Sequence, residues 1–143
     1  MGFRADLRAA AVTLFTDYKA DAGVLLQVYP GRPRTINPPT AFVDNIREAR
    51  VFTGPTLVQR TPTLECIVLH GLFDSKDAVE QGDAFVDGFL DWCDERFHAA
   101  GANTLIGAVS TEDVPNFVPD WLPPEQQRTY YATQINLEGF ATG

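Results

Sequence analysis

Apolar and polar positions follow two periods along the chain, one typical of helices and one typical of strands. Apolar residues recur at helical spacing near the N-terminus and again after Asp74, which predicts helices at about Phe3–Ala20 and Asp74–Phe97. Short apolar or alternating runs predict strands at Leu25–Tyr29, Thr40–Phe52, Thr56–Gly71, Thr104–Ser110 and Arg128–Phe140. The order α-β-β-β-α-β-β predicts an α+β fold, a mostly antiparallel sheet of about five strands with two helices packed on one face.

The second predicted helix separates charge from apolar surface. Its large apolar residues fill one side, namely Val79, Phe85, Val86, Phe89, Leu90, Trp92, Cys93 and Phe97. Its carboxylates fall within roughly 120° of arc on the other side at about 100° per residue, namely Asp77, Glu80, Asp83, Asp87, Asp91, Asp94 and Glu95. Like charges at these spacings repel, so burial of the apolar side must more than offset the repulsion. The acidic side is either a solvated exterior or a surface that meets a partner.

The predicted strands around Thr53-Gly54-Pro55 suggest a long antiparallel hairpin. Its inner half, Ala41–Val43 against Ile67–Leu69, is apolar and belongs to the core. Its outer half, Asn45–Pro62, has few large apolar residues and an internal proline, which predicts a β-hairpin arm that projects from the domain. We also expect Pro30–Pro39 to project as a stiff loop, and Thr111–Gln127 to form an irregular loop with exposed aromatic residues.

Composition limits the classes of protein to which the chain can belong. Its 143 residues are enough for one domain, residues 1–143, with a single core. A net charge of −8 argues against general affinity for nucleic acid or an anionic membrane. No apolar run approaches the ~18 residues that a membrane span needs, so we expect a soluble protein without a membrane partner. Cys66 and Cys93 lie among apolar residues, which predicts buried, free thiols.

Residue patterns for catalysis, metal binding and nucleotide binding are missing from the sequence. Cys66 and His70 share a face of one predicted strand but lie about 13 Å apart along it, too far to bind one ion. Neither serine lies in a nucleophile elbow, and no phosphate-binding glycine loop is present. The carboxylates line a convex helix, where each stays ionised and equivalent to the others. We therefore expect no enzyme, no cofactor and no metal.

Positive charge gathers elsewhere in the chain. We predict a contact with another subunit, or with another component of an assembly, from the arginines of the proline loop and of the arm, namely Arg32, Arg34, Arg47, Arg50 and Arg60. We predict a surface facing a lumen or a partner from the acids Glu80, Asp83, Asp87, Asp91 and Asp94. A head-to-tail contact between such surfaces is heterologous, and heterologous contacts close into rings when the rotation permits. The alternative is that both sets are ordinary solvated positions.

The chain as a whole resembles a known family. The order of elements and several segments, taken together, resemble the tail terminator proteins of long-tailed (siphovirus-type) bacteriophages, especially those that infect actinobacteria. The segments are Val28–Pro33, Pro38–Val43, Val68–Gly71, Phe85–Asp91, Tyr130–Thr133 and Leu137–Gly139.

This resemblance implies a structural protein without catalysis. Its partners would be its own copies in a hexameric ring, the major tail tube protein and the head connector or stopper protein, with DNA present only as it passes through the lumen. Its location would be the virion, at the head-proximal end of the tail, after assembly in the host cytoplasm. A related alternative is another neck, minor tail or head-tail joining protein of the same fold. An alternative of a different class is a small acidic binding module.

Overall fold

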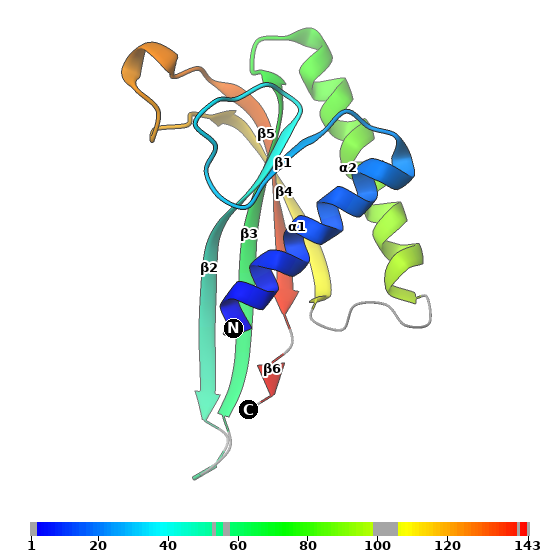
Figure 1. Cartoon of the computed structure of the whole chain (residues 1–143), viewed down its shortest axis with the longest axis vertical. Coiled ribbons are helices and arrows are strands. Elements are labelled where there is room, and N and C mark those ends of the chain that lie inside the picture. The colour runs from blue at the N-terminus through cyan, green and yellow to red at the C-terminus, as the bar shows by residue number, and fades with distance from the viewer. Residues whose placement is uncertain (1–2, 53, 56–57, 99–105, 140, 143) are drawn as a thin grey trace.

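The computed structural model describes residues 3–52, 54–55, 58–98, 106–139 and 141–142. It contains two long helices and one sheet (Figure 1). The elements in chain order are α1 (Phe3–Ala22), β1 (Gln27–Tyr29), β2 (Thr40–Phe52), β3 (Val58–Leu72), α2 (Lys76–His98), β4 (Ile106–Phe117), the 3₁₀ helix η1 (Pro124–Gln126), β5 (Tyr130–Gly139) and β6 (Ala141–Thr142).

The sheet is mixed, and β3 is its central strand. Strand order is β1-β2-β3-β5-β4, and the short β6 pairs with the outer part of β3. Only β1 and β2 run parallel, over three residue pairs, while all other neighbours are antiparallel. Because β5 lies antiparallel between β3 and β4, those two strands share a direction, and α2 connects them. The predicted α+β class and mostly antiparallel sheet are confirmed.

Both helices pack on one face of this sheet, as predicted. The core there joins Leu7, Leu14 and Phe15 of α1 with Phe89 of α2 and, from the strands, Val43, Leu64, Cys66, Val68, Ile135 and Leu137. The rings of Phe15 and Phe89 stack at 5.3 Å between centroids, which ties the two helices together. Complete burial of such aromatic and branched side chains supplies most of the driving force for folding.

The other face of the sheet has a second apolar cluster near one end. Phe42, Ile67 and Leu69 are buried there with Tyr130 and Ala132. Ile36 of the proline loop and Trp121 of the loop after β4 cover them. The ring centroid of Trp121 lies 5.3 Å from that of Phe42. Thus two loops, rather than further helices, close this side.

Three expectations about irregular segments are wrong. Strand β4 continues to Phe117 instead of ending at Ser110, because β5 supplies pairing partners as far as Tyr130. Phe117 and Trp121 are half-buried and not exposed. The proline loop does not project, since Pro33 is buried and its carbonyl oxygen accepts a hydrogen bond of 2.8 Å from the indole nitrogen of Trp121.

Strands β2 and β3 form the predicted hairpin pair. Ala41 lies opposite Val68 in the inner half, and pairing continues outward to Phe52 opposite Val58. A bulge between Val43 and Ile46 marks the change from the buried inner half to the largely exposed outer half. That the outer half projects as an arm stays a prediction, because residues 53, 56 and 57 and the side chains of residues 58–60 lie outside the described residues.

Candidate interaction surfaces

The acids of α2 form an exposed surface, which we call the α2 acidic surface. Its seven members are all exposed: Asp77, Glu80, Asp83, Asp87, Asp91, Asp94 and Glu95. None of them forms an ion pair within the described part of the chain. The predicted helical side therefore exists as one continuous run of accessible negative charge. Whether it faces a lumen, a partner or solvent stays a prediction.

Contacts with α1 fix the rotation of α2 and so decide which side its acids face. Trp92 donates a hydrogen bond of 2.9 Å to Asp21, and Arg96 donates one of 2.7 Å to Asp17. The guanidinium of Arg96 also lies over the Trp92 ring at 5.1 Å. Gly88 allows close packing, because a Cβ there would lie 2.8 Å from the Tyr18 hydroxyl. These contacts turn the acids outward.

A buried histidine, His70, which the sequence analysis considered only as a metal ligand, lies beneath α2. His70 is 4% exposed, and its Nε2 lies 2.9 Å from the hydroxyl oxygen of Thr133. Burial lowers the pKa of His70 to about 4, although nearby Asp113 opposes that change. A Cβ at Gly82 would come within 2.9 Å of the rings of His70 and Tyr131, so α2 needs glycine there to pack this closely. The neutral His70 is a core residue with one polar partner.

Three of the five predicted contact arginines are paired inside the molecule. Arg47 forms an ion pair with Glu65 across the β2–β3 pair. Arg32 donates to Asp44 at 2.8 Å and lies 5.1 Å from the centroid of the Trp121 ring. Arg50 lies 3.9 Å from Glu48, which Arg4 also approaches at 4.0 Å. The structure therefore does not gather these arginines into a separate, purely basic surface.

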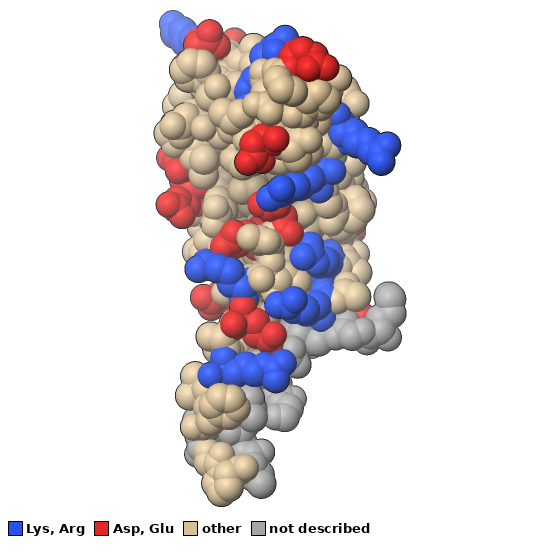
Figure 2. Space-filling model, turned by 90° about the vertical axis from the view of Figure 1, so that its left-hand side faces the viewer, with Lys and Arg blue, Asp and Glu red and all other residues tan. Residues whose placement is uncertain are grey.

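The other two predicted contact arginines are Arg34 and Arg60. Arg34 is exposed and forms no ion pair within the described part of the chain. The backbone of Arg60 pairs with Arg50, but its side chain lies outside the described residues. Figure 2 shows basic and acidic residues alternating along the face that β2 borders, with basic residues more numerous in the lower half. Positive charge on this side is interleaved with acids, unlike the unbroken negative charge of α2.

The outer strands leave backbone groups without strand partners. β1 covers only Thr40–Phe42 of β2, and from Val43 to Phe52 the outer edge of β2 meets no other strand in the described residues. The outer edge of β4 is likewise the end of the described sheet. Unpaired edges can accept a further strand, and charged side chains along an edge oppose unspecific pairing. Asp44, Arg47, Glu48 and Arg50 supply such charges on β2.

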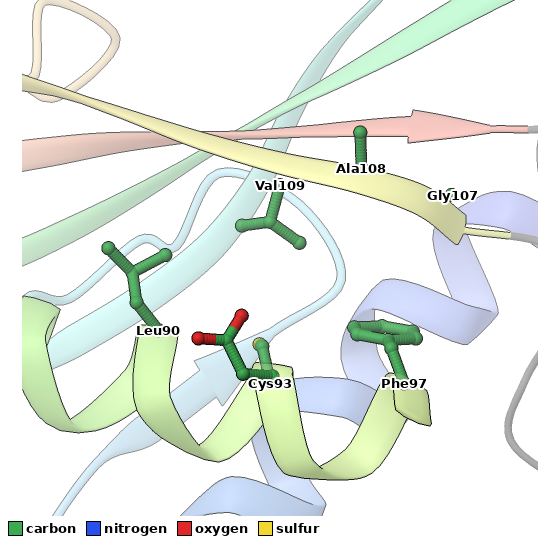
Figure 3. A pocket seen from close by; sticks show the side chains of 7 residues that line it. Leu90, Cys93, Phe97, Gly107, Ala108 and Val109 are labelled. Atoms are coloured by element: carbon green, nitrogen blue, oxygen red, sulfur yellow. The ribbon is translucent and has the colours of Figure 1, made fainter. Parts of the chain in front are cut away.

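A small cleft lies between the C-terminal half of α2 and the start of β4 (Figure 3). Its volume is about 210 Å³, and its lining is mixed: Leu90, Phe97 and Val109 are apolar, whereas Asp94 is charged. Cys93 borders it, but burial, followed by the charge of Asp94, raises the pKa of this thiol to about 12. A protonated thiol is a poor nucleophile and metal ligand. Cys93 is therefore not poised to act as a nucleophile in this cleft.

The described residues also offer little for metal binding. Among residues 3–52, 54–55, 58–98, 106–139 and 141–142, no three His, Cys, Asp or Glu side chains gather closely enough to hold an ion. Cys66 and Cys93 are buried and unbonded, as predicted, and burial raises the pKa of Cys66 to about 12. No helix within the described residues has the length and apolar content to cross a membrane.

Comparison with known proteins provides no family assignment. The chain matches no protein-family model and no curated protein sequence. Its function must therefore be inferred from its own residues and from the resemblance of its overall pattern.

Proposed function

We propose that this chain is a structural assembly protein, a tail terminator that forms a hexameric ring on the end of a phage tail tube. It would stop tube growth at the head-proximal end of the tail in the virion and provide the surface to which the head connector attaches. The observation that carries the proposal is the α2 acidic surface, seven exposed carboxylates without an ion pair in the described residues.

Charge and topology support a ring. The α2 acidic surface lies above β3 and β5, whereas the arginines Arg47 and Arg50 lie on β2, on the opposite side of β3 from β5. One side of the subunit is thus purely acidic, whereas the other carries arginines interleaved with acids. Such unlike sides favour heterologous contacts, which close into rings when the rotation permits. Acids that face a lumen would also repel the phosphates of passing DNA and keep it from adhering.

The same acidic surface favours a second candidate, a small binding module for a basic partner. Such a module needs accessible acids but no self-assembly and no tube. Another neck or minor tail protein of the same fold would share the ring but not the ability to stop tube growth. The two properties, ring formation and capping, therefore separate the three proposals.

Purified protein and purified tail tube protein provide the test. Light scattering after size-exclusion chromatography, with and without tubes, measures the number of copies, and electron microscopy measures tube length. We expect six copies on one end of each tube and an arrest of growth, with an unrelated acidic protein of similar size as a control. A monomer that leaves tube length unchanged would refute the terminator proposal. A ring that fails to cap tubes would favour another neck protein.

A further inference from the structure

Large exposed apolar side chains concentrate at the two ends of β3. Within the described residues they are Leu25, Val51, Phe52, Leu72, Phe73, Val79 and Val118. Val51 and Phe52, 49% and 75% exposed, lie beside the start of β3, opposite Gln59 and Val58. Leu72 ends β3 and Phe73 follows it, at 45% and 55% exposure. Leu25 is set apart from both groups, because it precedes the edge strand β1, which β2 separates from β3.

We call the first group the β2 end, defined by Val51 and Phe52, and the second the β3–α2 corner, defined by Leu72, Phe73 and Val79. Val79 belongs to the first turns of α2, and the corner is held together by a hydrogen bond of 3.0 Å from the Ser75 amide to the Leu72 carbonyl. Val118 follows β4 at the same end of the sheet, since Phe117 and Leu72 both lie opposite Tyr130. Figure 1 shows the β2 end at the bottom and the corner at the top.

The two ends cannot meet within one molecule. β3 is one strand of 15 residues, paired with β2 from Val58 to Leu69 and with β5 from Thr63 to Leu72. At about 3.3 Å per residue its ends lie roughly 45 Å apart. Any contact that buries both apolar ends against each other must therefore join two copies.

Charges near the two ends are complementary. The corner is bordered by three acids, Asp74, Asp77 and Glu80, and by two cations, Lys76 and Arg128. Arg128 lies there because it precedes Thr129, whose carbonyl oxygen accepts a hydrogen bond from the Phe73 amide. None of these five forms an ion pair within the described residues. Arg47 and Arg50 lie next to the β2 end. Glu65, the partner of Arg47, is set back from that end, and Glu48, the neighbour of Arg50, is shared with Arg4. Figure 2 shows basic residues directly above the lower end of the molecule, where the described residues carry no charge. Opposite net charge favours this pairing of ends over contact between like ends.

We propose that the β2 end of one copy docks on the β3–α2 corner of a second copy, with Val51 and Phe52 against Leu72, Phe73 and Val79, and Arg50 facing Asp77. The contact is heterologous, because different surfaces of the two copies meet. When the contact repeats from copy to copy, it closes into a ring or builds an open chain, depending on the rotation between neighbouring copies. This docking identifies the contact surfaces of the assembly, and in that sense it rests on the proposed function. Its test is separate from that of the proposed function.

Two variants with one damaged end each provide the test. Phe52→Ser damages the β2 end and Phe73→Ser damages the corner. Leu25→Ser is the control, because Leu25 is 86% exposed and lies beside the edge strand β1, which β2 separates from β3. Sedimentation measures self-association over a range of concentrations, and circular dichroism checks that each variant is folded. We expect the wild type and Leu25→Ser to associate equally and each end variant to associate about tenfold more weakly or worse.

Mixing the two end variants separates this contact from any other. An equimolar mixture contains one intact β2 end and one intact corner for each pair, so it should form dimers and nothing larger. Arg50→Glu should weaken association, and Asp77→Arg in the other copy should restore it.

The proposal is overturned if the Phe73→Ser protein still dimerises, which would indicate contact between β2 ends. It is also overturned if the mixture stays monomeric, or if the wild type stays monomeric at the highest concentration. Each of these outcomes leaves the result of tube capping unaffected, so failure of this contact and failure of the terminator proposal are distinguishable.

Discussion

His70 is a titratable group buried where water cannot stabilise its charge. Its pKa is lowered to about 4 by burial, against an ordinary value of 6.5. Its Nε2 has the Thr133 hydroxyl as a partner at 2.9 Å, and the rings of Phe85 and Tyr131 lie 5.6 and 6.0 Å away. This environment suits the neutral imidazole and penalises the imidazolium.

The position of His70 predicts a loss of stability in mild acid. Between pH 6.5 and about 4 the unfolded chain binds a proton that the folded protein does not, so the free energy of unfolding falls as pH falls through this window. Below this window the full loss of unfolding free energy is about 3 kcal/mol, and above it His70 causes no loss. Urea unfolding at a series of pH values measures it. His70→Gln should flatten the profile relative to the wild type, and parallel profiles for the two proteins would contradict the prediction.

At the scale of elements, patterning identified the long helices and the inner half of the hairpin but failed at the loops. The match of Ala41–Val43 with Ile67–Leu69 could be predicted because both runs are apolar and must be buried. The extension of β4 to Phe117 could not be predicted, because Glu112, Asp113 and Pro115 disfavour strands. Pairing with β5 overrides that preference. Likewise, prolines indicate a stiff loop but not the surface against which it packs.

Trp121 is the residue that holds the proline loop on the sheet. Its indole nitrogen donates to the Pro33 carbonyl, its ring lies under the Arg32 guanidinium, and it packs against Phe42. Trp121→Phe keeps an aromatic ring but removes the donor, and should lower the free energy of unfolding by about 1 kcal/mol. Trp121→Ala removes all three contacts and should lower it by about 2–4 kcal/mol.

Chemical denaturation measures both Trp121 variants, and hydrogen exchange in residues 31–37 reports on the loop directly. Phe73→Ala is the control for loss of an aromatic ring, because Phe73 is 55% exposed and should change stability by less than about 0.5 kcal/mol. An alanine variant at Trp121 with unchanged stability and unchanged exchange would mean that the loop is held by other contacts.

At the scale of the whole molecule, one candidate surface was predictable and the others were not. Helical periodicity alone was enough to place Asp83, Asp87 and Asp91 on one exposed side, because the opposite side had to be buried. Ion pairs such as Arg47 with Glu65 depend on strand register and a bulge, which the sequence does not reveal. The apolar residues of the β3–α2 corner were also missed, since exposure of Phe73 depends on where β3 ends and how α2 turns away.

The α2 acidic surface should reduce the stability of the isolated subunit. Asp83, Asp87 and Asp91 are spaced by four residues, so they form two like-charge pairs on successive turns. Changing all three to Asn, which has a similar helix propensity, should raise the free energy of unfolding by about 0.5–1 kcal/mol at low salt. The gain should shrink at high salt, where the repulsion is screened.

The matched control removes three acids that have no such neighbours, with Asp6→Asn, Glu125→Gln and Glu138→Gln. Its net charge equals that of the α2 variant, so a difference in assembly between the two comes from the position of the acids and not from total charge. Because Asp6 and Glu125 lie in the first turn of a helix, where an acid is favourable, the control should lose a little stability rather than gain it. If that surface has a role in assembly, the α2 variant should be more stable as a subunit yet worse at ring formation or tube capping, whereas the control should assemble normally. Such opposite changes in stability and assembly would be difficult to explain for a merely solvated surface. A variant that gains stability and assembles normally would instead assign the surface to solvent.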